Sequence, residues 1–224
     1  MNEPRNNRLL SALPQSAFQR IGDRLETIQL TKGQILVESN QNVDLLYFVT
    51  QGLVSLISVM QDGSSTEIGL IGREGVVGLP QLLGNGVLHS RSMVQIKGSG
   101  IRVEAQVLKE EFNRGESLHQ LLLQYNLKLF NQVSQTAVCN NHHTIKQRVA
   151  RWLLMLDDRL EKKTLAITQQ LLSQMLGVRR AGVTEAASEI KQSGIIDYQR
   201  GQIKILDRLA LEAIACECYQ IIQD

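Results

Sequence analysis

The 224-residue sequence has three cysteines, no long apolar run and a net charge of only +2. Three cysteines, an odd number, give no indication of a disulfide framework. No stretch approaches the ~18 consecutive apolar residues that a membrane helix needs. The first ten residues, MNEPRNNRLL, lack the apolar region of a signal peptide. We therefore expect a cytoplasmic protein with no membrane partner.

The length favours two modules, and an apolar content of 43% is enough to bury a real core. Charge is unevenly spread between the modules. Residues 140–206 hold eleven Lys and Arg against six Asp and Glu, a net +5, so the remainder carries −3. This distribution indicates either that only the carboxyl-terminal part meets a polyanion or that its helices have solvated charged surfaces.

Hydrophobic periodicity changes twice along the first half of the chain. Residues 5–27 have helical spacing with a break at Pro14. Residues 28–108 form short β-type runs separated by glycines, with Gln51-Gly52 and Asp62-Gly63 as expected hairpin turns. Such spacing predicts a β-sandwich or roll with strands in LLYFVT, LVSLISVM and STEIGLI.

A long helix is predicted from Leu118 to about residue 140, where Asn140-Asn141 should break it. Its apolar stripe can pack on a second copy of the same helix, as in a coiled-coil-like dimer, or on the chain's own β domain. We favour the homodimer. The expected seam alternates steps of four and three, and further apolar residues widen it: Leu118, Leu122, Tyr125, Leu129, Gln132 and Thr136, with Leu121, Phe130 and Val133.

The carboxyl-terminal part predicts a helix-turn-helix. A helix over 145–160 begins at the capping box Thr144–Gln147 and buries Trp152 as a core anchor. Thr168 can cap a helix over 169–176, Gly177 supplies a left-handed turn, and a second helix covers 179–192. The first turns of that second helix should present four side chains to a DNA major groove: Arg179, Arg180, Thr184 and Glu185.

A β-hairpin should follow directly. Ile196 and Tyr198 alternate with polar residues, the chain turns at Arg200-Gly201, and Ile203 and Ile205 alternate again. This is the wing of a winged helix, and Arg200 at its tip can meet a phosphate or be a solvated turn residue.

The whole order resembles the cyclic AMP receptor protein and fumarate–nitrate regulator (Crp/Fnr) family of bacterial transcription factors. The resemblance covers nearly the full chain, from YFVTQGLVSLISVMQDGSSTEIGLIGREGVVGLPQLLG to ITQQLLSQMLGVRRAGVTEAASEIKQSGII and the wing. It implies an α+β fold with a jelly-roll sensor over 1–117, a dimerisation helix over 118–140 and a winged helix-turn-helix over 141–224. It also implies a homodimer, a palindromic double-stranded DNA operator and contact with RNA polymerase.

The resemblance places individual DNA contacts. Arg180 falls where the family's cyclic AMP receptor has its first recognition arginine, and Thr168 and Gln170 fall at its backbone-contacting positions. Ala181 stands in place of a glutamate and Glu185 in place of a second arginine. A different operator should follow, because Glu accepts from cytosine where Arg donates to guanine. Glu185 can instead be a solvated charge or orient Arg180.

The family's cyclic-nucleotide cassette is only half present. Arg91-Ser92 occupy the phosphate position, but Leu79, followed by Pro80, stands where a glutamate would hold the ribose hydroxyl. Since leucine accepts no hydrogen bond, the sequence argues against cyclic AMP. Another small ligand at Arg91 and Ser92, or no ligand, remains open.

Neither a metal site nor an enzyme is expected. An iron–sulfur cluster usually takes four cysteines, whereas this chain has Cys139, Cys216 and Cys218. Cys216 and Cys218 should lie on one terminal helix and point to different faces, which indicates inert thiols or, alternatively, a redox switch. His142 and His143 are expected to be structural or solvated. Within the roll only His89 could serve a metal-dependent enzyme, which needs at least two histidines.

Two functions therefore compete. The first is a DNA-binding regulator in which an effector changes the spacing of two recognition helices. The second is a regulatory module whose winged helix contacts a protein partner. Salt-dependent DNA affinity discriminates them, because neutralising phosphates releases counterions.

Overall fold

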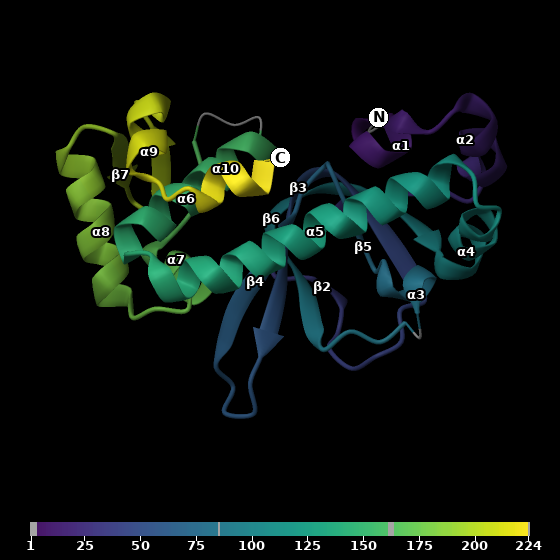
Figure 1. Ribbon diagram of the computed structural model, residues 1–224, viewed down its shortest axis with the longest axis horizontal. Coiled ribbons are helices and arrows are strands. Elements are labelled where there is room, and N and C mark those ends of the chain that lie inside the picture. Colours follow the sequence, from purple (N-terminus) through teal and green to yellow (C-terminus); the bar gives the residue numbers. More distant parts are fainter. Residues whose placement is uncertain (1–3, 85, 161–163, 224) are drawn as a thin grey trace. The chain divides into compact units, whose positions relative to one another are not determined.

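The computed structural model describes residues 4–84, 86–160 and 164–223, and the chain forms two compact units (Figure 1). The first comprises Met1–Val59 and Gly69–Phe130, and the second comprises Met60–Ile68 and Asn131–Asp224. Among the described residues, none of the helices combines the length and apolar character that crossing a membrane requires.

Short helices precede the β domain. After the 3-10 turn η1 (Pro4–Asn6) come α1 (Arg8–Ala12) and α2 (Gln15–Gly22), interrupted at Pro14 as predicted. Asn7 caps α1 by accepting from the backbone N–H groups of Leu9 and Leu10. The helical pattern ends at Gly22 rather than at residue 27, because β1 (Glu26–Leu30) already begins at Glu26 and pairs with the sheet.

One antiparallel sheet builds the first unit. Its main path is β1–β6–β3–β4, with β2 pairing with β6 and β5 pairing with β3. The remaining strands are β2 (Ile35–Val37), β3 (Leu45–Val59), β4 (Ser65–Ile71), β5 (Val76–Val77) and β6 (Ser90–Glu104). Phe48, Ile101 and Val103 pack in a core with the N-terminal helices. The predicted roll and the turn at Asp62-Gly63 are confirmed.

Gln51-Gly52 is not a hairpin turn, contrary to the prediction. β3 continues through it for 15 residues, and its register against β6 shifts on both sides of Gln51. Gly52 does have positive φ, at 93°, but uses it for a bulge instead of a reversal. Gly98 lies opposite, where a Cβ would collide with the carbonyl oxygen of Gln51. The close approach of two backbones therefore explains both glycines.

The short helix α3 (Pro80–Leu83) lies between β5 and β6, and α4 (Ala105–Asn113) and α5 (Ser117–His142) follow β6. α5 is uninterrupted (Figure 1) and ends at His142, two residues beyond the expected break. Of its predicted seam, Leu118, Leu122 and Tyr125 are buried in the core of the first unit, and Tyr125 donates to the carbonyl of Val76. Gln132 and Thr136 are also buried. The prediction is therefore wrong for these five positions, because they pack within the chain itself, whereas Phe130 of the predicted seam is exposed.

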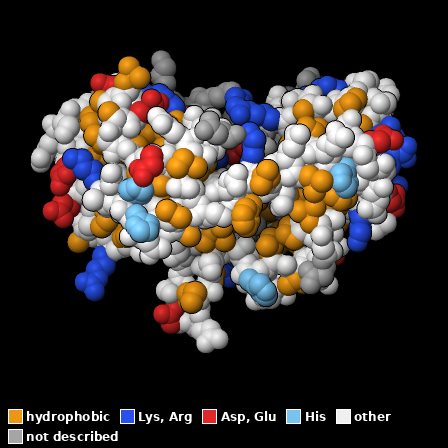
Figure 2. All heavy atoms as spheres, in the orientation of Figure 1, with side chains coloured by type: hydrophobic (Ala, Val, Ile, Leu, Met, Phe, Trp, Pro, Cys, Tyr) orange, Lys and Arg blue, Asp and Glu red, His pale blue; other side chains and the backbone are white. Residues whose placement is uncertain are grey.

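A different face of α5 is exposed. Leu127 and Phe130 are 59% and 65% exposed, and Leu123 and Val138 continue the same face along the helix. With exposed Ser134 and Ala137, the positions 123, 127, 130, 134 and 137 follow one another in alternating steps of four and three residues. Hydrophobic side chains follow the course of α5 on the face that Figure 2 shows. We call Leu123, Leu127, Phe130, Ser134, Ala137 and Val138 the α5 stripe.

The second unit holds the winged helix. Its elements are α6 (Ile145–Arg159), α7 (Gln169–Leu176), α8 (Arg180–Gln192), β7 (Ile196–Gln199), β8 (Gln202–Ile205), α9 (Arg208–Ile214) and α10 (Cys218–Gln223). The capping box at Thr144 is present, and Trp152 is buried. Helices, turn and hairpin fall where the sequence predicted them.

Candidate nucleic-acid interface

The turn between α7 and α8 fixes the direction of the second helix. Thr168 caps α7 by accepting from the backbone N–H of Leu171 at 3.1 Å, and Gly177 takes the left-handed conformation with φ 61°. Val183 and Ile190 are fully buried on the inner face of α8. Burial of that face leaves the opposite face of α8 toward solvent.

The outer face of α8 carries the predicted base-contacting residues. Arg179 is the N-cap residue of α8, Arg180 is its first residue, and Glu185 lies a turn and a half further on; all three are exposed. Gln170 is exposed on α7. An exposed arginine at the amino-terminal turn of the second helix is placed where such helices meet base edges.

Thr184 differs from the expectation of an outward side chain. It is half-buried, and its hydroxyl donates to Gln169 Oε1 or to the carbonyl of Arg180, each at 2.9 Å. The contact with Gln169 ties α8 to the start of α7. Thr184 therefore supports the geometry of the two helices.

The wing is a two-residue hairpin. Gln199 pairs with Gln202, and the loop residues Arg200 and Gly201 have φ of 49° and 76°. Two positive φ angles in a two-residue loop are the signature of a type I′ turn. Lys191 on α8 is 3.0 Å from both the Tyr198 carbonyl and the Asp197 carboxylate, which attaches the wing to α8. Arg200 is thus exposed at the tip of a braced hairpin.

Two buried arginines on α6 were not predicted from the sequence. Arg148 donates to the carbonyl of Leu176, at the carboxyl end of α7, where a cation favours the helix dipole. Arg151 lies 3.4 Å from the hydroxyl of Thr136 on α5. Only 6% of Arg148 and 3% of Arg151 are exposed. Both were counted in the net +5 of residues 140–206, which indicated contact with a polyanion or a solvated surface, and tertiary packing buried them instead.

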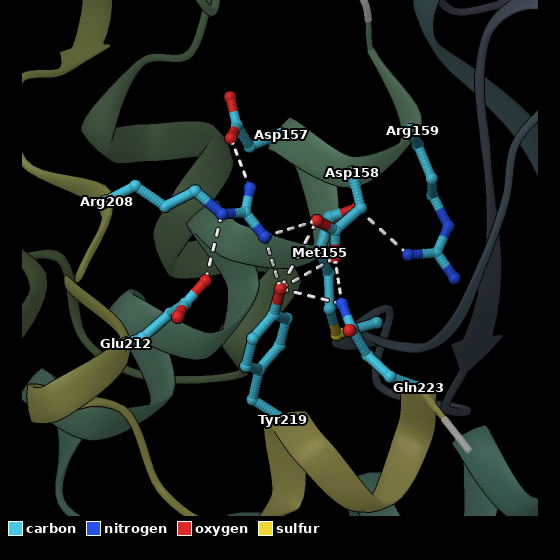
Figure 3. A network of polar contacts seen from close by, with 8 residues as sticks. All are labelled: Met155, Asp157, Asp158, Arg159, Arg208, Glu212, Tyr219 and Gln223. Carbon is cyan, nitrogen blue, oxygen red and sulfur yellow. Dashed lines mark hydrogen bonds and ion pairs between the residues drawn. The ribbon is translucent and has the colours of Figure 1, made fainter.

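An ion-pair network attaches the last two helices to α6 (Figure 3). Arg208 on α9 donates to Asp157, to Asp158 at 2.7 Å and to Glu212 at 2.9 Å. Tyr219 and Gln223 on α10 contact the same Asp158 carboxylate. Burial raises the pKa of Tyr219 to about 12, and the neighbouring Asp158 charge adds to the rise. The Tyr219 hydroxyl is therefore a hydrogen-bond donor at any physiological pH.

The candidate effector residues in the roll have partners or are buried. Arg91 Nε donates to Glu38 Oε1 at 2.9 Å. Ser92 is fully buried on β6, and its hydroxyl has no hydrogen-bond partner within the described part of the chain. Leu79 is packed in the apolar core. A cavity of about 180 Å³ lies beside Glu38, lined also by Val43 and Tyr47.

The Glu38–Arg91 ion pair should make the stability of the fold depend on pH. The hydrogen bond from Arg91 lowers the pKa of Glu38 below its ordinary 4.5. A lowered pKa means that the pair stabilises the fold above pH ~4.5 and that this contribution is lost as pH falls further. We expect Glu38→Gln to cost up to about 1 kcal/mol at pH 7 and progressively less as the pH falls below ~4.5, measured by denaturant unfolding. A cost that does not fall with pH contradicts the pairing, and exposed Glu104→Gln is the control.

The three cysteines do not lie as predicted. Cys216 lies in the corner between α9 and α10, and only Cys218 is on the terminal helix. The chain bends between them, so that both thiols come close to Cys139 and His143. Sequence reasoning treated these as unrelated side chains. The four-residue spacing of Cys139 and His143, one helical turn, is a signal that could have linked them.

Comparison with known proteins matches both units. Residues 147–214 match the Crp-like helix-turn-helix domain, and residues 27–114 match the cyclic nucleotide-binding domain. No curated protein matches the chain.

Solved structures share the fold. FixK2 from Bradyrhizobium japonicum is 19% identical, with 86% of this chain and 98% of that one covered and a TM-score of 0.74. A putative Crp/Fnr transcriptional regulator from Eubacterium rectale is 19% identical, with coverages of 93% and 98% and a TM-score of 0.71. The c-di-GMP responsive global regulator CLP of Xanthomonas campestris is 15% identical, with coverages of 86% and 99% and a TM-score of 0.70.

Proposed function

Because the chain belongs to the Crp/Fnr family of transcription regulators, we propose that it is a dimer that binds a palindromic DNA operator in the cytoplasm. The observation that carries this proposal is the position of Arg180. It is exposed at the first turn of α8, directly after a helix-turn-helix corner that buried residues hold in place.

In the proposed docking, α8 enters the major groove by its amino-terminal turns. Arg180 donates a bidentate pair to guanine, and Glu185 accepts from cytosine N4. Arg179 and the wing tip Arg200 neutralise phosphates on either side. Thr168 and Gln170 contact the DNA backbone beside α7. Thr184 fixes the position of α8 against α7 through its hydrogen bond to Gln169.

The α5 stripe is the proposed dimer interface. A monomeric protein gains nothing from exposing Leu123, Leu127 and Phe130 on one helix face. A second copy of α5 can cover them with the same steps of four and three. In this proposal the chain has a sensor over 1–117, a dimerisation helix over 118–140 and a DNA-binding part over 141–224.

Control by an effector at the roll is part of the proposal. The match of residues 27–114 to the cyclic nucleotide-binding domain supports a sensor there. An anionic effector at Arg91 would have to displace the Glu38 carboxylate, which already occupies the guanidinium. Leu79 offers no hydrogen bond to a ribose, so a ligand other than cyclic AMP fits this roll better.

The test is in-vitro selection of DNA bound by the purified protein, with and without cyclic AMP. We expect the same palindrome in both arms, with half-sites about one helical turn, ~34 Å, apart. Affinity for it should fall linearly with salt concentration on a double-logarithmic plot.

A protein-contacting winged helix is the alternative. It predicts no enriched sequence in the selection and DNA affinity with little salt dependence. RNA polymerase would then be the first protein partner to assay, since the family resemblance implies it. A palindrome that appears only with cyclic AMP would instead show that Arg91 and Ser92 suffice for nucleotide sensing.

A further inference from the structure

Four side chains of types that ligate metals converge in the second unit, and none of them is among the proposed DNA-contacting residues. Cys139 lies in the last turn of α5, His143 directly follows that helix, Cys216 lies in the α9–α10 corner and Cys218 begins α10. Their ligand atoms all lie within 4.8 Å of one another. All three thiols are free and buried.

The spacing fits one tetrahedral ion. Cys139 Sγ lies 3.5 Å from Cys216 Sγ, and Cys218 Sγ lies 3.4 Å from His143 Nδ1. Zinc–sulfur bonds of about 2.3 Å and zinc–nitrogen bonds of about 2.0–2.1 Å require edges of about 3.8 Å between sulfurs and about 3.6 Å between sulfur and nitrogen. These two pairs need to open slightly and the more distant pairs, up to 4.8 Å apart, need to close by about 1 Å to hold a single ion. An iron–sulfur cluster, which distributes its ligands over several irons, needs them farther apart.

We propose that Cys139, His143, Cys216 and Cys218 form a four-coordinate Zn²⁺ site. Three thiolates and an imidazole are a donor set of structural zinc sites. With four protein ligands no coordination position remains open for a substrate. The site is structural and ties the end of α5 to the α9–α10 corner.

Neighbouring side chains support the ligands in the way metal sites require. Glu217 Oε2 lies 3.1 Å from His143 Nε2, so the carboxylate can hold the proton on that nitrogen and leave Nδ1 to the ion. Gln135 Nε2 donates to Cys218 Sγ at 3.0 Å, which favours the thiolate. Each contact stabilises the form of the ligand that binds metal.

The buried arginines supply an independent argument from charge. Arg151 and Arg148 both lie within electrostatic reach of Cys139. In each, Nε is buried without a hydrogen-bond partner in the part of the chain that the structure describes. Two buried cations beside neutral thiols are costly. Zinc with three thiolates and a neutral imidazole carries a net charge of −1, which offsets half of the charge of the two arginines.

Contacts outside the proposed site also hold the last two helices in place. The Arg208 network holds α9 and α10 on α6 through Asp157 and Asp158, so loss of a metal ligand should leave the second unit assembled (Figure 3). His143→Ala is the main variant because His143 is less buried than the cysteines. His142→Ala, at the exposed neighbouring histidine, is the matched control.

The experiment measures metal in the reduced, full-length protein. We expect one zinc per chain by elemental analysis and, after exchange, the absorption of tetrahedral Co²⁺ with thiolate-to-cobalt charge transfer. His143→Ala should retain far less than one zinc per chain, whereas His142→Ala should match wild type. Glu217→Ala should weaken Co²⁺ binding by about 10–100-fold with circular dichroism unchanged.

Three outcomes would overturn the proposal. The first is wild-type protein without zinc and without the Co²⁺ spectrum. The second is a Co²⁺ spectrum that His143→Ala leaves unaltered. The third is a Co²⁺ spectrum without thiolate-to-cobalt charge transfer, which would exclude the cysteines as ligands.

Discussion

The double substitution Leu127→Glu, Phe130→Glu is expected to convert the protein into a monomer and to weaken operator binding by about 10²–10⁴-fold. Both side chains are mostly exposed in the single chain, so the substitution removes little packing within it. In the proposed dimer, each buried Leu or Phe contributes about 1.5–3 kcal/mol, and the change also places four carboxylates in an apolar seam. A monomer then binds one half-site only, without the gain in affinity that a dimer obtains by binding both half-sites at once.

Sedimentation and operator titration measure the two effects. The control is Gln124→Glu, Lys128→Gln, which makes the same change in net charge at exposed positions of α5 outside the stripe. If the stripe variant remains a dimer with unchanged thermal stability, the interface lies elsewhere and the proposed dimer is wrong.

Arg180→Ala is expected to cost about 1–3 kcal/mol per half-site and to relax the preference for one base pair in each half-site. The guanidinium is exposed at the first position of α8, and alanine is the best helix former, so the fold should be preserved. Loss of a bidentate donor to guanine leaves the other positions of the operator unchanged.

Arg200→Gln at the wing tip is the comparison variant for Arg180→Ala. Glutamine keeps a long side chain at a residue with positive φ, so the comparison isolates the charge. This variant should weaken binding to all DNA sequences about equally. It should also reduce the slope of log affinity against log salt concentration by about 1. Repeating the selection with both variants separates the roles. An unchanged sequence preference in Arg180→Ala would contradict the proposed docking of α8.

Local sequence signals determined the helices and turns of the second unit. Thr144 with Gln147, Thr168, Gly177 and Arg200-Gly201 are caps and turns whose physics involves only neighbouring residues. Their structures therefore follow from the chain within a few positions. The same holds for the argument that Leu79 cannot hold a ribose hydroxyl, because it depends on residue chemistry alone.

Only the tertiary structure decided which face of α5 is free. Steps of four and three describe both a coiled-coil seam and a helix packed on its own domain, and α5 has both. Leu122 and Tyr125 pack inside, whereas Leu127 and Phe130 face out. Gly52 is a similar case, since positive φ permits a turn or a bulge and the backbone of β6 opposite selected the bulge.

The convergence of Cys139 and His143 with Cys216 and Cys218 was likewise decided by the fold. Cys139 and Cys216 are 77 residues apart, and no periodicity links them. The sequence by itself determined the order of elements, because caps, turns and helical periods are local. The tertiary structure decided the α5 stripe, the buried arginines and the thiol–imidazole cluster, because each depends on which distant surfaces pack together.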